Sequence, residues 1–407
     1  MDDLSPRRID HPTPPSARRT AHSSWRLVAA LSAMTLLIQG CTVMALGLYL
    51  SPVAHDIGSM AGAATLFLLA MSLANLPVGW ALQRVKPRLV LGAGIALTVS
   101  GCAAAALART THELALALAL TGSGVSAATI VPGVAIITHH HVAARGLALA
   151  LFLGASVLAG AALPPLVSLA IGAAGWRTAL LLSALAIALL CAPLLWLVPP
   201  ERIGGTGPAS PPRALIEAAW RNADVLRLLI AMTLIQLAIN GILFSAVDAL
   251  VAQGVGRSGA VAAYSIANLL GLPALLLGGA LADRVGARRA LIGTALLLAA
   301  GTASLMAVQA MGLAGVALFV LLWGVASALP GQSGSMLLAD VVEPRLFAGL
   351  LGFNTAIASL VGAIAPAWTE QLRESSGGFA LPIAVYAALA LLAVPFIAAA
   401  RPRASKP

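Results

Sequence analysis

The sequence has few charged residues and little polar surface to offer to water. Only 9% of its 407 residues are Asp, Glu, Lys or Arg, while 60% are hydrophobic, and the mean hydropathy is +0.96. A soluble globular domain is about half apolar and about a quarter charged, so this composition excludes one. It indicates a protein whose main solvent is the lipid bilayer.

Cysteine is scarce, and ionisable side chains are missing from the middle of the apolar stretches. The three cysteines, Cys41, Cys102 and Cys191, fall in three different stretches, which predicts buried thiols and neither a disulfide nor a metal site. Without a central His or Asp, no catalytic constellation can form inside the membrane. We therefore expect no enzyme and no cofactor.

Apolar stretches of about 20 residues recur along the chain, and each can cross a hydrocarbon core of about 30 Å as a helix. The fold class predicted is an all-α membrane protein with twelve transmembrane helices. They are expected at 27–50, 60–82, 89–108, 114–138, 145–168, 178–198, 225–250, 259–281, 288–309, 313–338, 346–367 and 379–400.

The longest polar interruption, at 199–224, is rich in Pro, Gly and Ser and predicts a linker. It separates two six-helix bundles, 27–198 and 225–400, with tails at 1–26 and 401–407, the first of them expected to be disordered. Of the 24 Lys and Arg residues, 20 lie on the side of the termini. This positive-inside bias predicts cytosolic termini, and the residue usage favours a bacterial inner membrane.

The two halves repeat each other without a gap when the first is shifted by 200 positions. The shift superimposes glycines and arginines of two short loops and of the next loop in each half. The aligned pairs are Gly79 with Gly279, Arg84 with Arg284, Arg88 with Arg288 and Arg145 with Arg345; Gln83 stands opposite Asp283 and Lys86 opposite Gly286.

The second of these loops, "GGALADRVGARR" at 278–289, resembles the loop signature of the major facilitator superfamily and lies between the eighth and ninth stretches, where that family carries it. "GLYLSPVAHDIG" at 47–58 is similar to the monocarboxylate-transporter-like branch. The resemblance implies a monomeric transporter in which two pseudo-symmetric bundles rock around a central site.

The resemblance also implies a role for the loop as a gate. Asp283 would brace the start of the fifth helix near Arg145 while the cytoplasmic side is shut, and would release it when that side opens. Gln83 carries no charge, so we expect a weaker brace onto the eleventh helix. The competing interpretation is that the arginines only orient the chain in the membrane.

Polar side chains follow one face of two helices that are mates in the repeat, the first and the seventh. In this superfamily the first, fourth, seventh and tenth helices line the central cavity, and the tenth adds an aromatic ring above a hydroxyl. The candidate substrate-binding residues are Thr35, Gln39, Thr42, Gln236, Asn240, Trp323 and Ser327. The competing interpretation for each is a helix-to-helix hydrogen bond, which we favour for Asn268 and Asn354.

The absence of central charge points to a neutral or amphipathic substrate. Where the monocarboxylate-like branch often carries Arg, this chain has Leu272, and the first helix has no acid of the kind that drug exporters often carry. Drug or metabolite efflux and organic-acid uptake both stay open. Asp248, the deepest acid, is the candidate for coupling to a proton or ion, against a solvated helix end.

Two further features keep alternatives open. The three histidines of "THHHVAARG" at 138–146 are expected to be solvated, although metal binding or pH sensing is the alternative. Gln83 keeps open a sensor or scaffold that has a transporter fold but does not transport. The partners we expect are a small-molecule substrate and membrane lipid, and no nucleic acid.

Overall fold

The structure, a computed structural model, describes residues 15–58, 60–141, 144–203, 217 and 220–400. Within these ranges all regular elements are helices, as expected. The first bundle consists of α1 (Pro15–Cys41), α2 (Leu46–Asp56), α3 (Ala61–Arg84), α4 (Pro87–Leu107), α5 (Thr111–Ala128), α6 (Ile130–His140) and α7 (Arg145–Leu194), followed by the turn η1 (Leu195–Leu197).

The second bundle repeats this order. It consists of α9 (Ala223–Ala252), α10 (Arg257–Val285), α11 (Ala287–Ser304), η2 (Leu305–Ala307), α12 (Val308–Met311), α13 (Leu313–Ala328), α14 (Pro330–Val341), α15 (Pro344–Ser376) and α16 (Ala380–Ala399). Most of the predicted linker, and the tail at 401–407, lie outside the described residues. The first helix begins at Pro15, so part of the tail predicted at 1–26 is helical.

Eleven helices in the described ranges are long and apolar enough to cross a membrane. One of them, Arg145–Leu197, contains two crossings, because Gly175 breaks α7 with φ 81° and ψ 164°. A positive φ of this size is strained for any residue with a Cβ, so glycine allows the chain to reverse there. The twelve predicted crossings are therefore confirmed.

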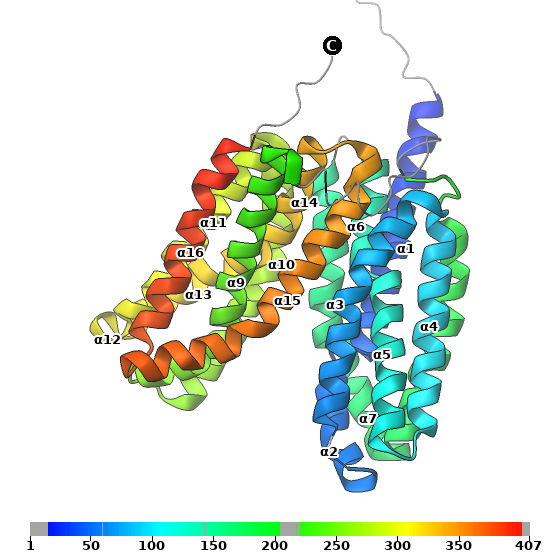
Figure 1. Cartoon of the computed structure of the whole chain (residues 1–407), viewed down its shortest axis with the longest axis horizontal. Coiled ribbons are helices and arrows are strands. Elements are labelled where there is room, and N and C mark those ends of the chain that lie inside the picture. The colour runs from blue at the N-terminus through cyan, green and yellow to red at the C-terminus, as the bar shows by residue number, and fades with distance from the viewer. Residues whose placement is uncertain (1–14, 59, 142–143, 204–216, 218–219, 401–407) are drawn as a thin grey trace, which may run out of the picture.

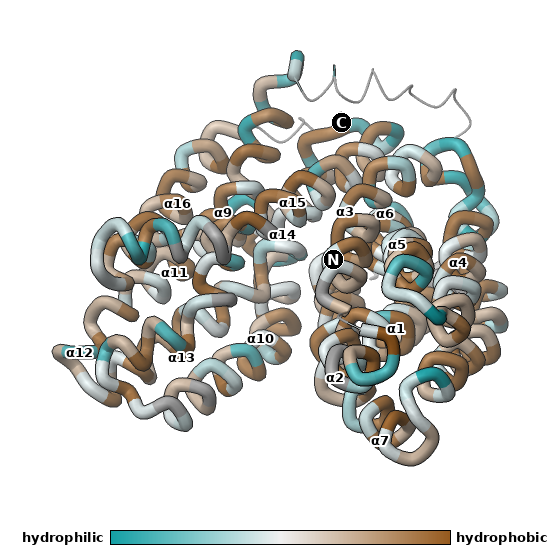
Figure 2. Tube along the Cα trace, turned by 60° about the horizontal axis from the view of Figure 1, so that its bottom comes forward, coloured by the Kyte–Doolittle hydropathy of each residue, from teal (hydrophilic) through white to brown (hydrophobic). Residues whose placement is uncertain are grey.

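The bundles come together at one end of the molecule and diverge at the other (Figure 1). We call the end where α1 begins and α16 ends the terminal end, and the opposite one the far end. Hydrophobic residues recur along the helices of both bundles (Figure 2), and many of their large apolar side chains are exposed, as a chain surrounded by lipid requires. Leu277, for example, is 73% exposed.

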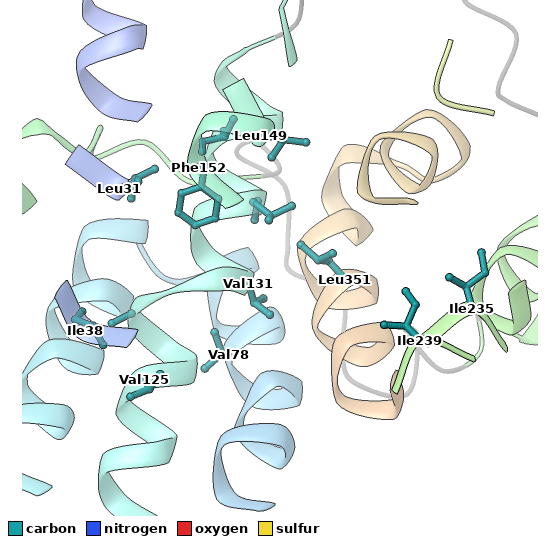
Figure 3. Packing of buried hydrophobic residues seen from close by; sticks show 14 of the residues in the cluster. Leu31, Ile38, Val78, Val125, Val131, Leu149, Phe152, Ile235, Ile239 and Leu351 are labelled. Atoms are coloured by element: carbon teal, nitrogen blue, oxygen red, sulfur yellow. The ribbon is translucent and has the colours of Figure 1, made fainter. Parts of the chain in front are cut away.

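Aliphatic and aromatic side chains fill each bundle. Figure 3 shows Ile38 and Phe152 packed inside the first bundle and Ile235 and Ile239 in the second, while Leu351 on α15 points toward the first. Between the bundles, α3 packs mainly against α15 and α7 mainly against α10. The interface between the bundles is thus built by two repeat-related pairs of helices.

The fourth and tenth crossings are each broken near the middle. Helix α5 ends one residue before Thr129, whose φ of −125° and ψ of −109° are not helical, and α13 ends just before Leu329. Pro132 and Pro330 follow these breaks and lack the N–H that would continue the helical ladder. The fourth crossing therefore leaves the helical path at Thr129, whereas in the tenth Leu329 keeps helical dihedrals, φ −80° and ψ −28°, and only the hydrogen-bond ladder is interrupted.

The far end of the first bundle is held by a clamp around Arg177. Its guanidinium donates to Asp56 Oδ2 at 3.0 Å and to the carbonyls of Ala106 and Ala108 at 3.0 and 2.7 Å. Trp176 Nε1 donates to the same carboxylate at 3.1 Å. The clamp ties α2, the end of α4 and the break in α7 together. Among the described residues the second bundle has no equivalent clamp, because the positions that correspond to Asp56 and Arg177 in the repeat are Gly256 and Gly377.

Arg177→Ala is expected to lower the melting temperature of the purified protein, because two helix-end carbonyls lose their donor and the Asp56 carboxylate keeps only the bond from Trp176. The group is partly exposed, so the loss of unfolding free energy is about 1 to 2 kcal/mol. The measurement is thermal unfolding in detergent followed by tryptophan fluorescence. Arg109→Ala, an exposed cation at the same end, is the control; equal melting temperatures for both variants would rule out the clamp.

Candidate functional site

A cavity of about 260 Å³ lies between the bundles. The side formed by the first bundle is aliphatic, and all polar side chains come from the second. It is lined by Ile130 and Val134 of α6, Leu153 of α7, Met232, Gln236 and Asn240 of α9, Pro330, Gly331 and Ser335 of α14, and Leu351, Asn354, Thr355, Ala358 and Ser359 of α15. None of these lining residues is charged.

The polar wall contains both satisfied and unsatisfied groups. Gln236 Nε2 donates to Asn240 Oδ1 at 3.1 Å, one helical turn away, which leaves the Gln236 carbonyl and the Asn240 amide N–H groups for another partner. Asn354 is only 5% exposed, and its Oδ1 has no hydrogen-bond partner among the described residues. A buried acceptor without a donor costs free energy, so this atom is suited to receive a ligand N–H or O–H.

The hydroxyls of the wall are used differently. Thr355 Oγ1 donates to Leu351 O at 2.8 Å and Ser335 Oγ to Gly331 O at 2.6 Å. Each hydroxyl spends its proton on its own helix and keeps lone pairs free for a donor. Taken together, the cavity offers amides and acceptors on one side and hydrocarbon on the other, without a formal charge.

Two of the sequence candidates, Gln236 and Asn240, line this cavity, and the three in the first crossing do not. Thr35 and Gln39 are buried, and Thr42 Oγ1 donates to Ile38 O at 2.6 Å where α1 ends. Thr42 also lines a separate hollow of about 20 Å³ inside the first bundle, beside Cys41 and Cys102. The cysteines are buried and free, as predicted, in the described part of the chain.

The predicted aromatic wall on the tenth crossing is not part of the cavity. Trp323 is 0% exposed and packs inside the second bundle, stacked on Phe319 with ring centroids 5.5 Å apart and beside Tyr264. Ser327 Oγ donates to Gly324 O at 3.3 Å. Of the tenth crossing, only the part after Leu329, with Pro330, Gly331 and Ser335, lines the cavity, whereas Trp323 packs against its own bundle.

Four polar lining residues were not among the candidate substrate-binding residues: Ser335 on α14 and Asn354, Thr355 and Ser359 on α15. Asn354 was visible in the sequence as an amide within an apolar stretch, and was interpreted as a helix-packing residue. Its position on α15 instead places it in the wall. The signal was present, but the assumption that four particular helices line the cavity excluded the helix that carries it.

At the terminal end Asp283 joins the bundles as expected. Its two carboxylate oxygens accept from Gly146 N at 2.7 Å and Leu147 N at 3.1 Å, the first turn of α7. These N–H groups have no partner within the helix, and the helix dipole favours a negative charge there. We call this contact the Asp283 latch.

Two further contacts reinforce the Asp283 latch. Arg145 Nη2 donates to Asp340 Oδ1 at 2.7 Å across the bundles, and Gln332 Nε2 donates to Gly146 O at 2.6 Å. Gly279 lies so close to Gly146 that a Cβ on it would overlap the Gly146 carbonyl. The glycine of the loop signature is therefore required by a close helix contact.

The repeat-related loop makes a different bond. The amide of Gln83 lies 3.1 Å from both Arg345 O and Gly349 N on α15, and its orientation is assigned from these partners: the nitrogen donates to Arg345 O and the oxygen accepts from Gly349 N. Gly79 packs against Ala348 and Gly352 in the same way that Gly279 packs against α7. We call this the Gln83 latch. It needs one donor and one acceptor, which an amide has and a carboxylate lacks.

The arginines of the loops bind within their own bundle. Arg88 donates to Trp196 O at 3.0 Å and Val198 O at 2.9 Å, and Arg288 donates to Ala398 O. Arg84 stacks over Trp80 at 4.0 Å, Arg284 is exposed, and Gly286 turns the chain with φ 90°. These cations anchor the loops and do not bridge the bundles.

Two remaining candidates lie away from the cavity. Asp248 is exposed, two turns beyond Asn240 on α9, or about 12 Å toward the far end. His141, expected to be solvated, is buried at the terminal end, where its ring lies 5.2 Å from that of Trp25. Burial lowers the pKa of His141, and the neighbouring His140 lowers it further, so the ring is neutral at pH 7. The described residues include no group of three metal-ligating side chains.

Comparison with known proteins identifies the architecture. Residues 28–366 match the model of the Major Facilitator Superfamily. The structure of the proton:xylose symporter XylE bound to 6-bromo-6-deoxy-D-glucose matches with a TM-score of 0.73 at 15% identity, covering 94% of this chain and 97% of that one. The outward-conformation structure of FucP matches with a TM-score of 0.72 at 12% identity, covering 93% and 98%.

The E. coli fucose:proton symporter FucP also matches, with a TM-score of 0.71 at 12% identity over 94% of this chain and 97% of that one. No curated protein matches the chain. At these identities the likeness establishes the fold, and it does not distinguish the monocarboxylate-transporter-like branch from others.

Proposed function

The chain belongs to the major facilitator superfamily, and on that basis we propose that it transports a small neutral molecule across the membrane by alternating access. The cavity between the bundles is the binding site in this proposal. Its amide and hydroxyl wall faces an aliphatic wall, and none of its lining residues is charged. A charged substrate bound there would lose its hydration without a counter-ion, which is costly.

The form described here is the one shut at the terminal end. Both latches are made, and the bundles diverge toward the far end (Figure 1). We propose that the terminal end is cytosolic in a bacterial inner membrane, so this form opens outward. The opposite form would break both latches and bring the far ends together. In that form we propose that Thr35, Gln39 and Thr42 of the first crossing approach the substrate.

The experiment is a ligand screen followed by a flux measurement. Purified protein is screened by thermal shift against neutral polyols, amides, nucleosides and amphipathic drugs, with monocarboxylates and organic cations as charged comparators. A hit is then tested for flux in proteoliposomes. We expect stabilisation by a neutral compound and saturable flux; binding without flux would identify a sensor, and preference for the charged compounds would refute the neutral site.

We propose that Asp248 couples substrate transport to the movement of protons. The matched symporters are named as proton-coupled, but here no titratable side chain lines the cavity among the residues described. Asp248→Asn is expected to leave thermal-shift binding unchanged and to abolish accumulation driven by a pH gradient, while exchange of labelled for unlabelled substrate continues. Asp224→Asn, an acid at the other end of α9, is the control. Gradient-driven accumulation that survives Asp248→Asn would refute this assignment.

A further inference from the structure

The second bundle carries a groove of about 560 Å³ between α10, α11, α13 and the start of α14, and it shares no lining residue with the central cavity. Its walls are mostly aliphatic, and Leu277 and Leu281 on α10 are 73% and 56% exposed. In a membrane such a surface faces acyl chains, so the hollow is open to hydrocarbon from the bilayer.

The dimensions of the groove suit one acyl chain of one leaflet. Its lining residues on α10 run from Leu270 to Val285, which is about 22 Å at the helical rise, somewhat more than half of a hydrocarbon core of about 30 Å. On α11 the wall includes Gly293, which is exposed and has no atom within 4 Å of the place where a Cβ would lie. The absence of a side chain there keeps the groove open.

One cation stands at the terminal end of the groove. Arg289 is exposed, lines the groove and makes no hydrogen bond or ion pair with any described residue, whereas its neighbour Arg288 donates to Ala398 O. The nearby carboxylate of Asp283 is occupied by the backbone of α7. The repeat-related position in the first bundle is Leu89, which is neutral and 60% exposed. The unpaired charge is therefore specific to this groove.

We propose that this groove binds an anionic phospholipid, with an acyl chain along α10 and the phosphate at Arg289. A basic residue near a membrane surface favours an anionic over a zwitterionic headgroup by about 1 kcal/mol, which corresponds to roughly fivefold. The acyl chain supplies binding that both lipid types share, and Arg289 supplies the preference between them.

The test is native mass spectrometry of the full chain with equal dioleoyl phosphatidylglycerol and dioleoyl phosphatidylcholine. Wild type is expected to retain phosphatidylglycerol with a preference of about fivefold. Arg289→Gln should remove the preference, and the double variant Arg289→Gln with Leu89→Arg, which restores net charge elsewhere, should not recover it. Recovery in the double variant, or an unchanged preference in the single one, would overturn the proposal.

A second pair of variants tests the acyl chain. Gly293→Leu places a side chain in the groove at a position where a Cβ meets no atom within 4 Å, and it should reduce retention of both lipids several-fold. Gly172→Leu, at an exposed glycine on α7 with the same open space around a Cβ, should not. The melting temperature of each variant is measured as well, so that a misfolded sample is recognised. Equal lipid retention by the two would overturn the assignment of this groove.

Discussion

Asp283→Asn is expected to shift the protein from the form shut at the terminal end toward the form open there. The carboxylate holds two N–H groups at the first turn of α7, at 2.7 and 3.1 Å, and its charge faces the positive end of the helix dipole. Asparagine keeps one acceptor, loses the charge and places an NH₂ group against donors. The cost to the shut form is about 1 to 2 kcal/mol, or roughly a 5- to 30-fold change in the ratio of the two forms.

The measurement is the distance between two spin labels across the bundles. Exposed Lys86 and Ala223 supply a pair at the terminal end, and exposed Thr110 and Glu374 a pair at the far end. The three native cysteines are buried, so labels attach to the introduced ones. In Asp283→Asn the terminal-end distance should lengthen and the far-end distance shorten. Asp224→Asn, which removes an acid from a helix start within one bundle, should change neither.

Gln83→Asp is expected to act in the same direction, although it restores the residue found in the other repeat. Gln83 fits between the carbonyl of Arg345 and the N–H of Gly349, so a carboxylate there would lose the bond to the carbonyl and repel it. The two loops are thus chemically adapted to different partners: a free helix start for Asp283 and an intact helical turn for Gln83. If Gln83→Asp instead tightens the terminal end, or if both variants match wild type, the latches do not control the gate.

The sequence was sufficient for the fold because the bilayer makes the relevant signals long-ranged and redundant. Twelve apolar stretches, their repeat over 200 positions and the distribution of cations each point to the same two bundles. The contact of Asp283 with α7 was implied by family resemblance, and the structure contains it. The partner atoms of Gln83, on Arg345 and Gly349, could not be predicted, because they depend on which turn of α15 lies next to the loop.

The cavity was predicted less completely, for a geometrical reason. A row of polar residues identifies one face of a helix, but it does not say what that face meets: Trp323 packs on Phe319 and Tyr264 inside the second bundle, while Gly331 lines the cavity. Conversely, α15 has only a few polar residues in its apolar part, so Asn354 resembled a packing residue. Which polar residues meet depends on helix breaks and tilts, and these are set by packing that a single sequence does not specify.

Asn354→Leu is expected to reduce ligand affinity most among single changes in the cavity. The side chain is buried, and its Oδ1 has no protein partner to compensate it in the described residues, so in this proposal its main partner is the ligand. Losing a hydrogen bond to a buried ligand group, and leaving that group unpaired, costs about 1 to 3 kcal/mol, or roughly 5- to 150-fold in Kd. Leucine has a similar volume, so the cavity changes in polarity more than in size.

Replacing a neighbouring cavity residue should lower ligand affinity less, and replacing an amide outside the cavity serves as the control. Gln236→Leu should weaken binding less than Asn354→Leu does. Gln236 Nε2 now donates to Asn240 Oδ1, so in the variant Asn240 Oδ1 becomes free to accept a hydrogen bond from the ligand. Asn268→Leu changes an exposed amide on α10 that donates to the Tyr264 carbonyl at 2.9 Å and does not line the cavity, and it should leave Kd unchanged. Affinities are compared by calorimetry on the compound found in the screen. If Asn354→Leu and Asn268→Leu bind it equally well, the ligand does not occupy the cavity between α9, α14 and α15.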